Sequence, residues 1–202
     1  MPRPSLQLTA FKTMLQEENY VILDTETTGL KDAQICQIAI IDRHGSVLLN
    51  TYVKPTHPIP ASATAIHNIT NDMVQGAPVW SDVSPLLLPL LTGCDVIAFN
   101  AVFDRKMMHK SAEAVGLPKT DWKTLGRWWC AMLAFSEIYG VRDRQRAGFR
   151  YQSLQTAARH YGIRVNAAHT ALDDCLTTLA VVKAIAAEKQ TSDPTDRPHM
   201  NS

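Results

Sequence analysis

Apolar residues along the chain occur in short β-branched runs and in longer stretches where they recur every three or four positions. The short runs predict β-strands and the longer stretches predict α-helices. On this basis strands are expected over residues 20–24, 36–42, 47–53 and 95–99. Helices are expected over residues 6–17, 61–67, 81–91, 101–115, 125–139, 152–161 and 170–188. Trp128 and Trp129 fall within the helix over 125–139, and we interpret them as core residues without a functional role.

The order of these segments predicts an α/β protein. The polar turn Asp42-Arg43-His44-Gly45 separates the second strand from the third, which predicts a β-hairpin and therefore some antiparallel pairing. Helices lie between and after the strands, so we expect a mixed β-sheet flanked by α-helices. Residues 1–188 are expected to form one domain, with residues 1–18 as a helical extension. Residues 189–202 are polar and contain two prolines, which favours a disordered tail.

Composition limits the classes of function that fit the chain. With 46% hydrophobic and 19% charged residues, it is typical of a globular protein with a substantial core. The formal net charge of +1 does not indicate a nucleic-acid-binding protein, so such binding would require a local basic patch or bound cations. The four cysteines are far apart, which favours buried thiols in a reducing compartment. The most apolar run, 83–91, is too short to span a membrane, and we expect a cytoplasmic protein with no membrane association.

The first predicted strand ends in two carboxylates. Asp24 and Glu26 are separated by one residue, so their side chains project from the same face of an extended chain. Adjacent carboxylates on a buried strand repel one another and lose hydration unless a cation neutralises them. A divalent metal such as Mg²⁺, which prefers oxygen ligands, satisfies both requirements. The alternative is that Asp24 only caps the turn at the end of the strand.

Two further acidic residues begin predicted helices. Asp104 falls in the first turn of its helix, where the helix dipole alone is enough to favour a carboxylate. Asp174 lies on a largely apolar stripe of the last helix, so its carboxylate needs a partner, and a metal shared with the strand carboxylates provides one. We favour Asp174 over Asp173 as the ligand, because Thr170-x-x-Asp173 is typical of a capping box.

In chain order, these clusters resemble the signature of the DEDDh exonucleases, the proofreading-exonuclease family that includes the epsilon subunit of bacterial DNA polymerase III. The matching motifs are Asp24-x-Glu26-Thr27-Thr28-Gly29, Asn100-x-x-Phe103-Asp104 and His169-x-Ala171-x-x-Asp174. The segment Ala65-Ile66-His67-Asn68-Ile69-Thr70 is similar to a family segment that has glycine after the histidine. The chain departs from the family at Asn68, and at Lys123-Thr124, where the family often has Asp-Thr. Neither departure falls on a metal ligand.

The resemblance implies a ribonuclease-H-like fold and a site for two Mg²⁺ or Mn²⁺ ions. The ligands carried over are Asp24, Glu26, Asp104 and Asp174, and His169 is the general base that takes a proton from the attacking water. Two ions about 4 Å apart stabilise the attacking and leaving oxygens at phosphorus, and a free imidazole pKa of about 6.5 suits the base at neutral pH. The reaction implied is 3′→5′ exonuclease hydrolysis of DNA, expected to be single-stranded, with release of nucleoside 5′-monophosphates.

The resemblance also implies which residues hold the 3′ end of the DNA strand. Backbone amides of Thr27, Thr28 and Gly29 are expected near the terminal 3′-hydroxyl, because glycine permits close approach. Side chains expected to contact the last nucleotides are Leu30, Ile66 and Phe103 against bases, and His67 and Asn100 against phosphate or sugar. For Leu30 and Ile66, packing in the core explains the sequence about equally well.

Several functional alternatives remain open from the sequence. An exoribonuclease that trims RNA or short oligoribonucleotides fits the same motifs, since none of them reads a 2′-hydroxyl. A catalytically silent nucleic-acid-binding module would be expected to lack a ligand, and every ligand is present. Residues 141–150 hold four arginines and one aspartate, which suits either a phosphate-binding patch or a solvated loop. Docking of the tail or first helix on a polymerase or a repair protein is also compatible with the sequence.

Overall fold

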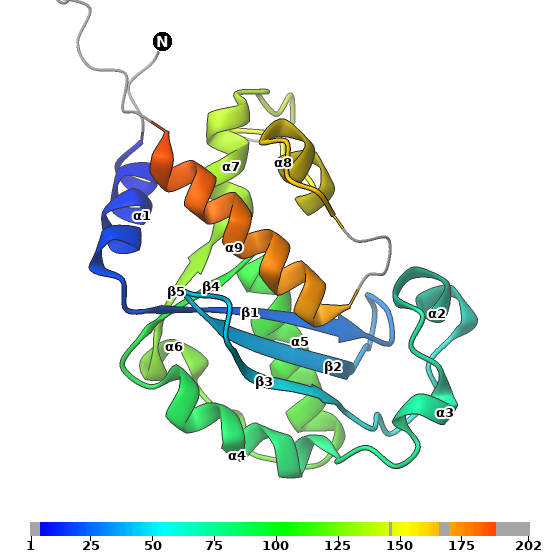
Figure 1. Cartoon of the computed structure of the whole chain (residues 1–202). Coiled ribbons are helices and arrows are strands. Elements are labelled where there is room, and N and C mark those ends of the chain that lie inside the picture. Colours follow the sequence, from blue (N-terminus) through cyan, green and yellow to red (C-terminus); the bar gives the residue numbers. More distant parts are fainter. Residues whose placement is uncertain (1–4, 146, 166–169, 189–202) are drawn as a thin grey trace, which may run out of the picture.

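The structure of the chain, a computed structural model, describes residues 5–145, 147–165 and 170–188. In these residues a five-stranded β-sheet has α-helices packed on both faces (Figure 1). The strands are β1 (Tyr20–Thr27), β2 (Ile35–Asp42), β3 (Val47–Tyr52), β4 (Asp95–Ala98) and β5 (Arg127–Cys130). The helices are α1 (Leu6–Glu17), α2 (Ala61–His67), α3 (Asn71–Val74), α4 (Trp80–Leu91), α5 (Ala101–Ala114), α6 (Trp122–Leu125), α7 (Ala131–Tyr139), α8 (Leu154–His160) and α9 (Ala171–Ala187).

The sheet is mixed, which confirms the α/β architecture expected from the sequence. Its strand order is β3-β2-β1-β4-β5. β2 pairs antiparallel with both β1 and β3, whereas β4 runs parallel to both β1 and β5. The expected β2–β3 hairpin is present, and the carboxylate of Asp42 closes its turn by accepting hydrogen bonds from the backbone N–H groups of His44 and Ser46, each at 2.8 Å.

β1 lies between two hydrophobic cores. Ile22 belongs to the core formed with α1, α7, α8 and α9, and Leu23 to the core formed with α4, α5 and α6. Successive side chains of a strand point to opposite faces of its sheet. The same alternation therefore directs Asp24 and Glu26 toward the α9 face and Thr25 toward the α5 face.

Residues 125–139 do not form one helix, so that prediction is wrong. Arg127–Cys130 form the edge strand β5, and the helix begins only at Ala131. Adjacent tryptophans favour a strand, and Arg127 anchors the strand by a bidentate contact with Asp95, Nε to Oδ1 at 2.5 Å and Nη2 to Oδ2 at 2.8 Å. Trp128 and Trp129 consequently pack against different cores, one on each face of the sheet edge.

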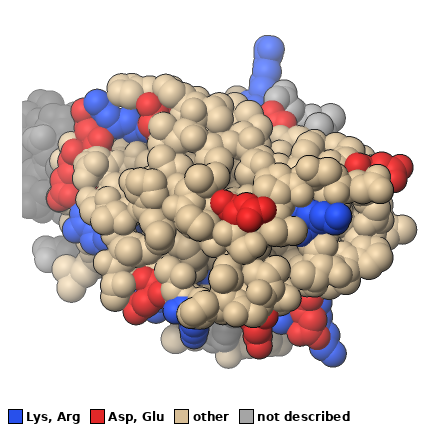
Figure 2. All heavy atoms as spheres, turned by 90° about the horizontal axis from the view of Figure 1, so that it is seen from below, with Lys and Arg blue, Asp and Glu red and all other residues tan. Residues whose placement is uncertain are grey.

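The face of the molecule over α4 carries few charged side chains (Figure 2). Leu86 and Leu88 of α4 are exposed. No basic patch gathers on this face, so it offers no obvious attraction to a polyanion. Among the described helices, none combines the length and the hydrophobicity that a membrane crossing requires.

Candidate active site

The carboxylates of Asp24, Glu26 and Asp174 cluster near the carboxyl end of β1. β1 continues past the end of its parallel neighbour β4, and α9 packs on β1. One carboxylate oxygen from each of the three residues lies within 4.8 Å of the other two. Oxygen donors at this spacing suit a hard divalent cation. The structure thus brings together three of the four acidic residues that the sequence singled out.

Asp104 approaches this cluster from the other face of the sheet. It lies in the first turn of α5, which begins shortly after β4 ends, and only 3% of it is exposed. Its Oδ1 accepts a hydrogen bond from the Oγ1 of Thr25 at 2.8 Å. Because Thr25 points away from the face that carries Asp24 and Glu26, Asp104 lies beside the group of three and not within it.

The electrostatics of these carboxylates favour a bound cation. Burial, together with the charges of Asp104, Asp174 and Glu26, raises the pKa of Asp24 well above its ordinary value. Burial and the charges of Asp174 and Asp104 raise the pKa of Glu26 to about 8. Burial also raises the pKa of Asp104 to about 7, although the hydrogen bond from Thr25 lowers it. A divalent cation would remove the repulsion and the burial cost that these shifts reflect.

Contacts at the first turn of α9 hold Asp174 in place. The Oγ1 of Thr170 accepts from the backbone N–H of Asp173 at 3.1 Å and donates to its Oδ2 at 2.6 Å, so Asp173 takes part in the helix cap. Gln37 of β2 accepts from the first backbone N–H of α9 at 3.1 Å. The thiol of Cys175 donates to a carbonyl oxygen of β2 at 3.5 Å. Sequence reasoning missed Gln37, although a polar residue within an otherwise apolar strand was a usable signal.

The segment after β1 is held by the buried ring of His67. Its Nδ1 accepts a backbone N–H at 3.0 Å, which leaves Nε2 to donate to the carbonyl oxygen of Thr27 at 3.2 Å. Thr28 pairs with Gln34 through its backbone N–H and its hydroxyl. Gly29 has a φ of 142°, a conformation that other residues rarely adopt. These contacts fix the backbone of residues 27–29, while direct contact of His67 with a substrate stays a prediction.

The side chains expected to contact the last nucleotides are only partly available for binding. Leu30 and Ile66 are 80% and 63% exposed, so neither is a core residue. Asn100 precedes α5 without a side-chain capping bond to that helix, and Phe103 packs partly against the α5 core. Their roles as substrate contacts stay predictions. His169 lies outside the described residues.

Comparisons with known proteins agree with this geometry. The family model described as Exonuclease, of the RNase T type, matches residues 21–182. A protein of Escherichia phage 186 named as an uncharacterized exonuclease is 40% identical over 174 residues, which cover 84% of this chain and 89% of that protein. A DNA polymerase III epsilon-like protein of Rhodobacter capsulatus is 30% identical over 177 residues, but only 23% of its length is covered.

Solved structures lead to the same family. Exonuclease X, in a complex with 5′ overhanging duplex DNA, superposes with a TM-score of 0.59 at 30% identity and covers 82% of this chain and 90% of its own. Exonuclease I of E. coli, in a complex with a dT13 oligonucleotide, gives a TM-score of 0.68 at 18% identity over 84% of this chain and 41% of its own. This second likeness confirms the expected ribonuclease-H-like fold. The chain therefore belongs to the RNase T exonuclease family, the DnaQ-like enzymes that its DEDDh motifs resemble.

Proposed function

We propose that the chain is a metal-dependent 3′→5′ exonuclease that releases nucleoside 5′-monophosphates from single-stranded 3′ ends of DNA. The observation that carries this proposal is the cluster of Asp24, Glu26 and Asp174, whose oxygens lie within 4.8 Å of one another, with Asp104 beside it. Four carboxylates near the carboxyl end of β1 would repel a polyanionic substrate. The cluster is therefore proposed to bind cations first and the phosphodiester afterwards.

The donor set fits two Mg²⁺ or Mn²⁺ ions, because every ligand offered is a carboxylate oxygen. When bound, such ions stabilise the negative charge on the phosphate and on the attacking and leaving oxygens. The chain itself holds the ligands in place: the pleat of β1 aligns Asp24 and Glu26, the cap of α9 positions Asp174, and Thr25 orients Asp104.

His169 is the proposed general base, on the strength of its place in the third motif. It directly precedes Thr170, the residue that caps the helix bearing Asp174. In this role its imidazole accepts the proton of the attacking water, a step that contributes about 10²–10⁴-fold to such reactions.

The 3′ end of the DNA strand is proposed to lie against Leu30 and Ile66. Both side chains are exposed and apolar, and the hydrogen bond from His67 to the carbonyl of Thr27 ties their two segments together. Apolar contacts with a terminal base read no sequence, which suits an enzyme that removes every nucleotide in turn. Asn100 and Phe103, at the start of α5, supply the remaining contacts with sugar and base.

DNA is favoured as the substrate by the relatives. Exonuclease X, which is similar over most of both chains, was solved with a duplex DNA that has a 5′ overhang. The Rhodobacter capsulatus relative is named for DNA polymerase III, although this chain matches only a part of it. These names support DNA over RNA without fixing strandedness.

Product analysis tests the proposal. The chain is incubated with Mg²⁺ and matched DNA and RNA oligonucleotides labelled at the 5′ end, as single strands and as duplexes with blunt or 5′-overhanging ends. We expect labelled DNA to shorten one nucleotide at a time, faster when single-stranded, and to stay intact in EDTA. Immediate release of labelled mononucleotide would indicate the opposite polarity. Shortening of RNA alone would identify an exoribonuclease, and no shortening in Mg²⁺ or Mn²⁺ would indicate a binding module.

A further inference from the structure

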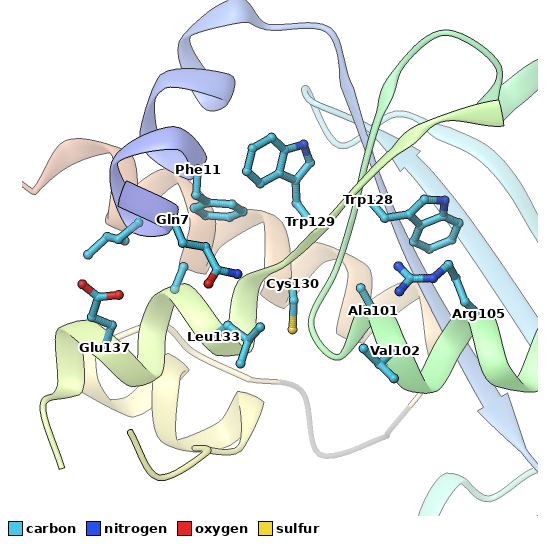
Figure 3. A pocket seen from close by; sticks show the side chains of 12 residues that line it. Gln7, Phe11, Ala101, Val102, Arg105, Trp128, Trp129, Cys130, Leu133 and Glu137 are labelled. Atoms are coloured by element: carbon cyan, nitrogen blue, oxygen red, sulfur yellow. The ribbon is translucent and has the colours of Figure 1, made fainter. Parts of the chain in front are cut away.

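A pocket of about 180 Å³ lies between α1, α5, β5 and α7, apart from the carboxylate cluster (Figure 3). Its aromatic walls are Phe11 of α1 and the indoles of Trp128 and Trp129. Arg105 of α5 and Gln7 of α1 bring polar groups to it. None of these five residues belongs to the motifs that define the family resemblance.

The pocket and the carboxylate cluster share the first turns of α5. Ala101, Val102 and Arg105 line the pocket, while Asp104, directly before Arg105, turns to Thr25 of β1. Residues one apart on a helix differ by about 100° in direction, so the two sites occupy neighbouring sides of the same helix. The pocket therefore lies next to the helix turn that presents Asp104 to β1.

Arg105 is the group in the pocket that points to a ligand. Its guanidinium lies over the ring of Trp128, 5.1 Å from the centroid (Figure 3). Within the described residues it forms no hydrogen bond or ion pair, and burial lowers its pKa. The donors of this half-buried guanidinium still reach solvent, so they are available to a ligand. A ligand with hydrogen-bond acceptors would satisfy them.

The other polar groups limit what the ligand can be. Glu137, the only carboxylate among the lining residues, already accepts hydrogen bonds from the backbone N–H and the hydroxyl of Ser5, each at 2.6 Å. The thiol of Cys130 donates to a backbone carbonyl at 3.3 Å. The uncommitted groups are thus the guanidinium of Arg105, which lies over the ring of Trp128, and the amide of Gln7. The ring of Trp129 is already covered by the guanidinium of Arg127, 5.3 Å from its centroid.

We infer that this pocket receives one base of the bound strand, upstream of the 3′ end. The inference rests on the proposed function. The volume is below the roughly 300–1,000 Å³ of pockets for drug-sized ligands, so a single planar ring system fits better than a longer group. Bases stack on indole and guanidinium planes and accept hydrogen bonds from arginine. The pocket would hold the strand in register while the terminal nucleotide is removed.

An abasic scan of the substrate tests this inference. Single-stranded DNA oligonucleotides, each with one abasic position counted from the 3′ end, are compared for kcat/KM. We expect one upstream abasic position to lower kcat/KM of the native chain about tenfold, the scale of one lost base-stacking contact. Arg105→Met keeps an aliphatic cover on Trp128 but removes the guanidinium plane and its donors, so it should weaken the dependence on that position; an unchanged dependence would argue against the pocket inference. Arg159→Met, at an exposed residue of α8, is the matched control and should keep the native dependence.

Tryptophan fluorescence in EDTA provides a readout that needs no catalysis. Trp80 and Trp122 are 2% and 1% exposed, so quenching by a bound strand reports on Trp128 and Trp129. Quenching that is lost when the same position is abasic supports the inference. Nucleotide release with a flat abasic profile and no quenching would overturn the pocket inference alone, and would leave a protein partner as its occupant. Absence of any metal-dependent release would instead overturn the proposed function.

Discussion

The hydroxyl of Thr25 donates a hydrogen bond of 2.8 Å to Oδ1 of Asp104, and this contact ties α5 to β1 at the candidate active site. Asp24 and Glu26, on either side of Thr25, point to the opposite face, where Asp174 meets them. Three consecutive residues of β1 thus place two carboxylates directly and orient a third. Because side chains alternate along a strand, one short segment of β1 meets Asp174 of α9 on one face of the sheet and Asp104 of α5 on the other.

The Thr25–Asp104 contact should control metal affinity. Thr25→Val removes the donor, so the pKa of Asp104, which this hydrogen bond lowers, should rise further. We expect the Mg²⁺ concentration for the half-maximal rate to increase about tenfold, the scale of one hydrogen bond to a charged group. Titration of the exonuclease rate with Mg²⁺ measures this shift. Thr25→Ser restores the donor and should restore the native value; equal Mg²⁺ dependence in all three proteins would rule out the role.

Stability of the metal-free protein should fall as pH rises. The pKa of Glu26 is raised to about 8 in the folded chain, above its ordinary value of 4.5, so the folded state binds more protons than the unfolded state between these values. The free energy of unfolding therefore decreases through this interval. Thermal unfolding in EDTA should give a lower Tm at pH 8 than at pH 6. Mn²⁺ should raise Tm more at pH 8; a Tm that rises with pH in EDTA would argue against the clustered carboxylates.

Asp173 and Asp174 should behave differently despite being adjacent. Asp174→Asn removes a ligand charge, and the loss of several kcal/mol of charge stabilisation should slow nucleotide release by about 10²–10³-fold. Asp173→Asn weakens the cap of α9, so it should lower the free energy of unfolding by about 1 kcal/mol or less and leave the rate near native. Single-turnover rates and chemical denaturation separate the two effects. A larger rate loss for Asp173→Asn would reverse the assignment.

Leu30 should act in substrate binding and not in stability. Because 80% of it is exposed, Leu30→Ala should change the free energy of unfolding by about 0.5 kcal/mol or less. If it covers the terminal base, KM for short single strands should rise about fivefold to tenfold, the scale of burying part of one leucine. Leu86→Ala is a matched control on α4, because 53% of Leu86 is exposed. Equal KM values for the two variants would remove Leu30 from the binding site.

Local patterns predict much of this fold, and long-range pairing explains the main error. The hairpin of β2 and β3 and the helix bearing Asp174 follow from residue order and periodicity. The first strand was expected only as far as Asp24, whereas β1 continues to Thr27 and so includes Glu26. The strand at Trp128 and Trp129 depends on pairing with β4, about thirty residues earlier in the chain, which no local pattern contains. The pairing with β4 and the contact of Arg127 with Asp95 therefore fix this segment as a strand.

Among the site residues, too, local patterns identify some features and long-range packing determines the others. Carboxylates are recognisable by type and motif spacing, but the bond from Thr25 to Asp104 requires knowledge of which helix covers which face. His67 is 4% exposed with both ring nitrogens engaged, a consequence of how α2 packs on the segment after β1, while its expected contact with the substrate stays a prediction. Burial and partners of a polar residue are properties of the assembled fold, so sequence alone does not supply them.

The most direct test of a metal-dependent site is the release of 3′ nucleotides from 5′-labelled single-stranded DNA by the native chain and by Asp24→Asn in Mg²⁺. Circular dichroism and thermal unfolding first establish that the variant is folded. The native chain should shorten the DNA from its 3′ end, and the folded variant should release no nucleotide. Retained Mg²⁺-dependent release by folded Asp24→Asn would contradict the assignment of the carboxylate cluster as the catalytic site.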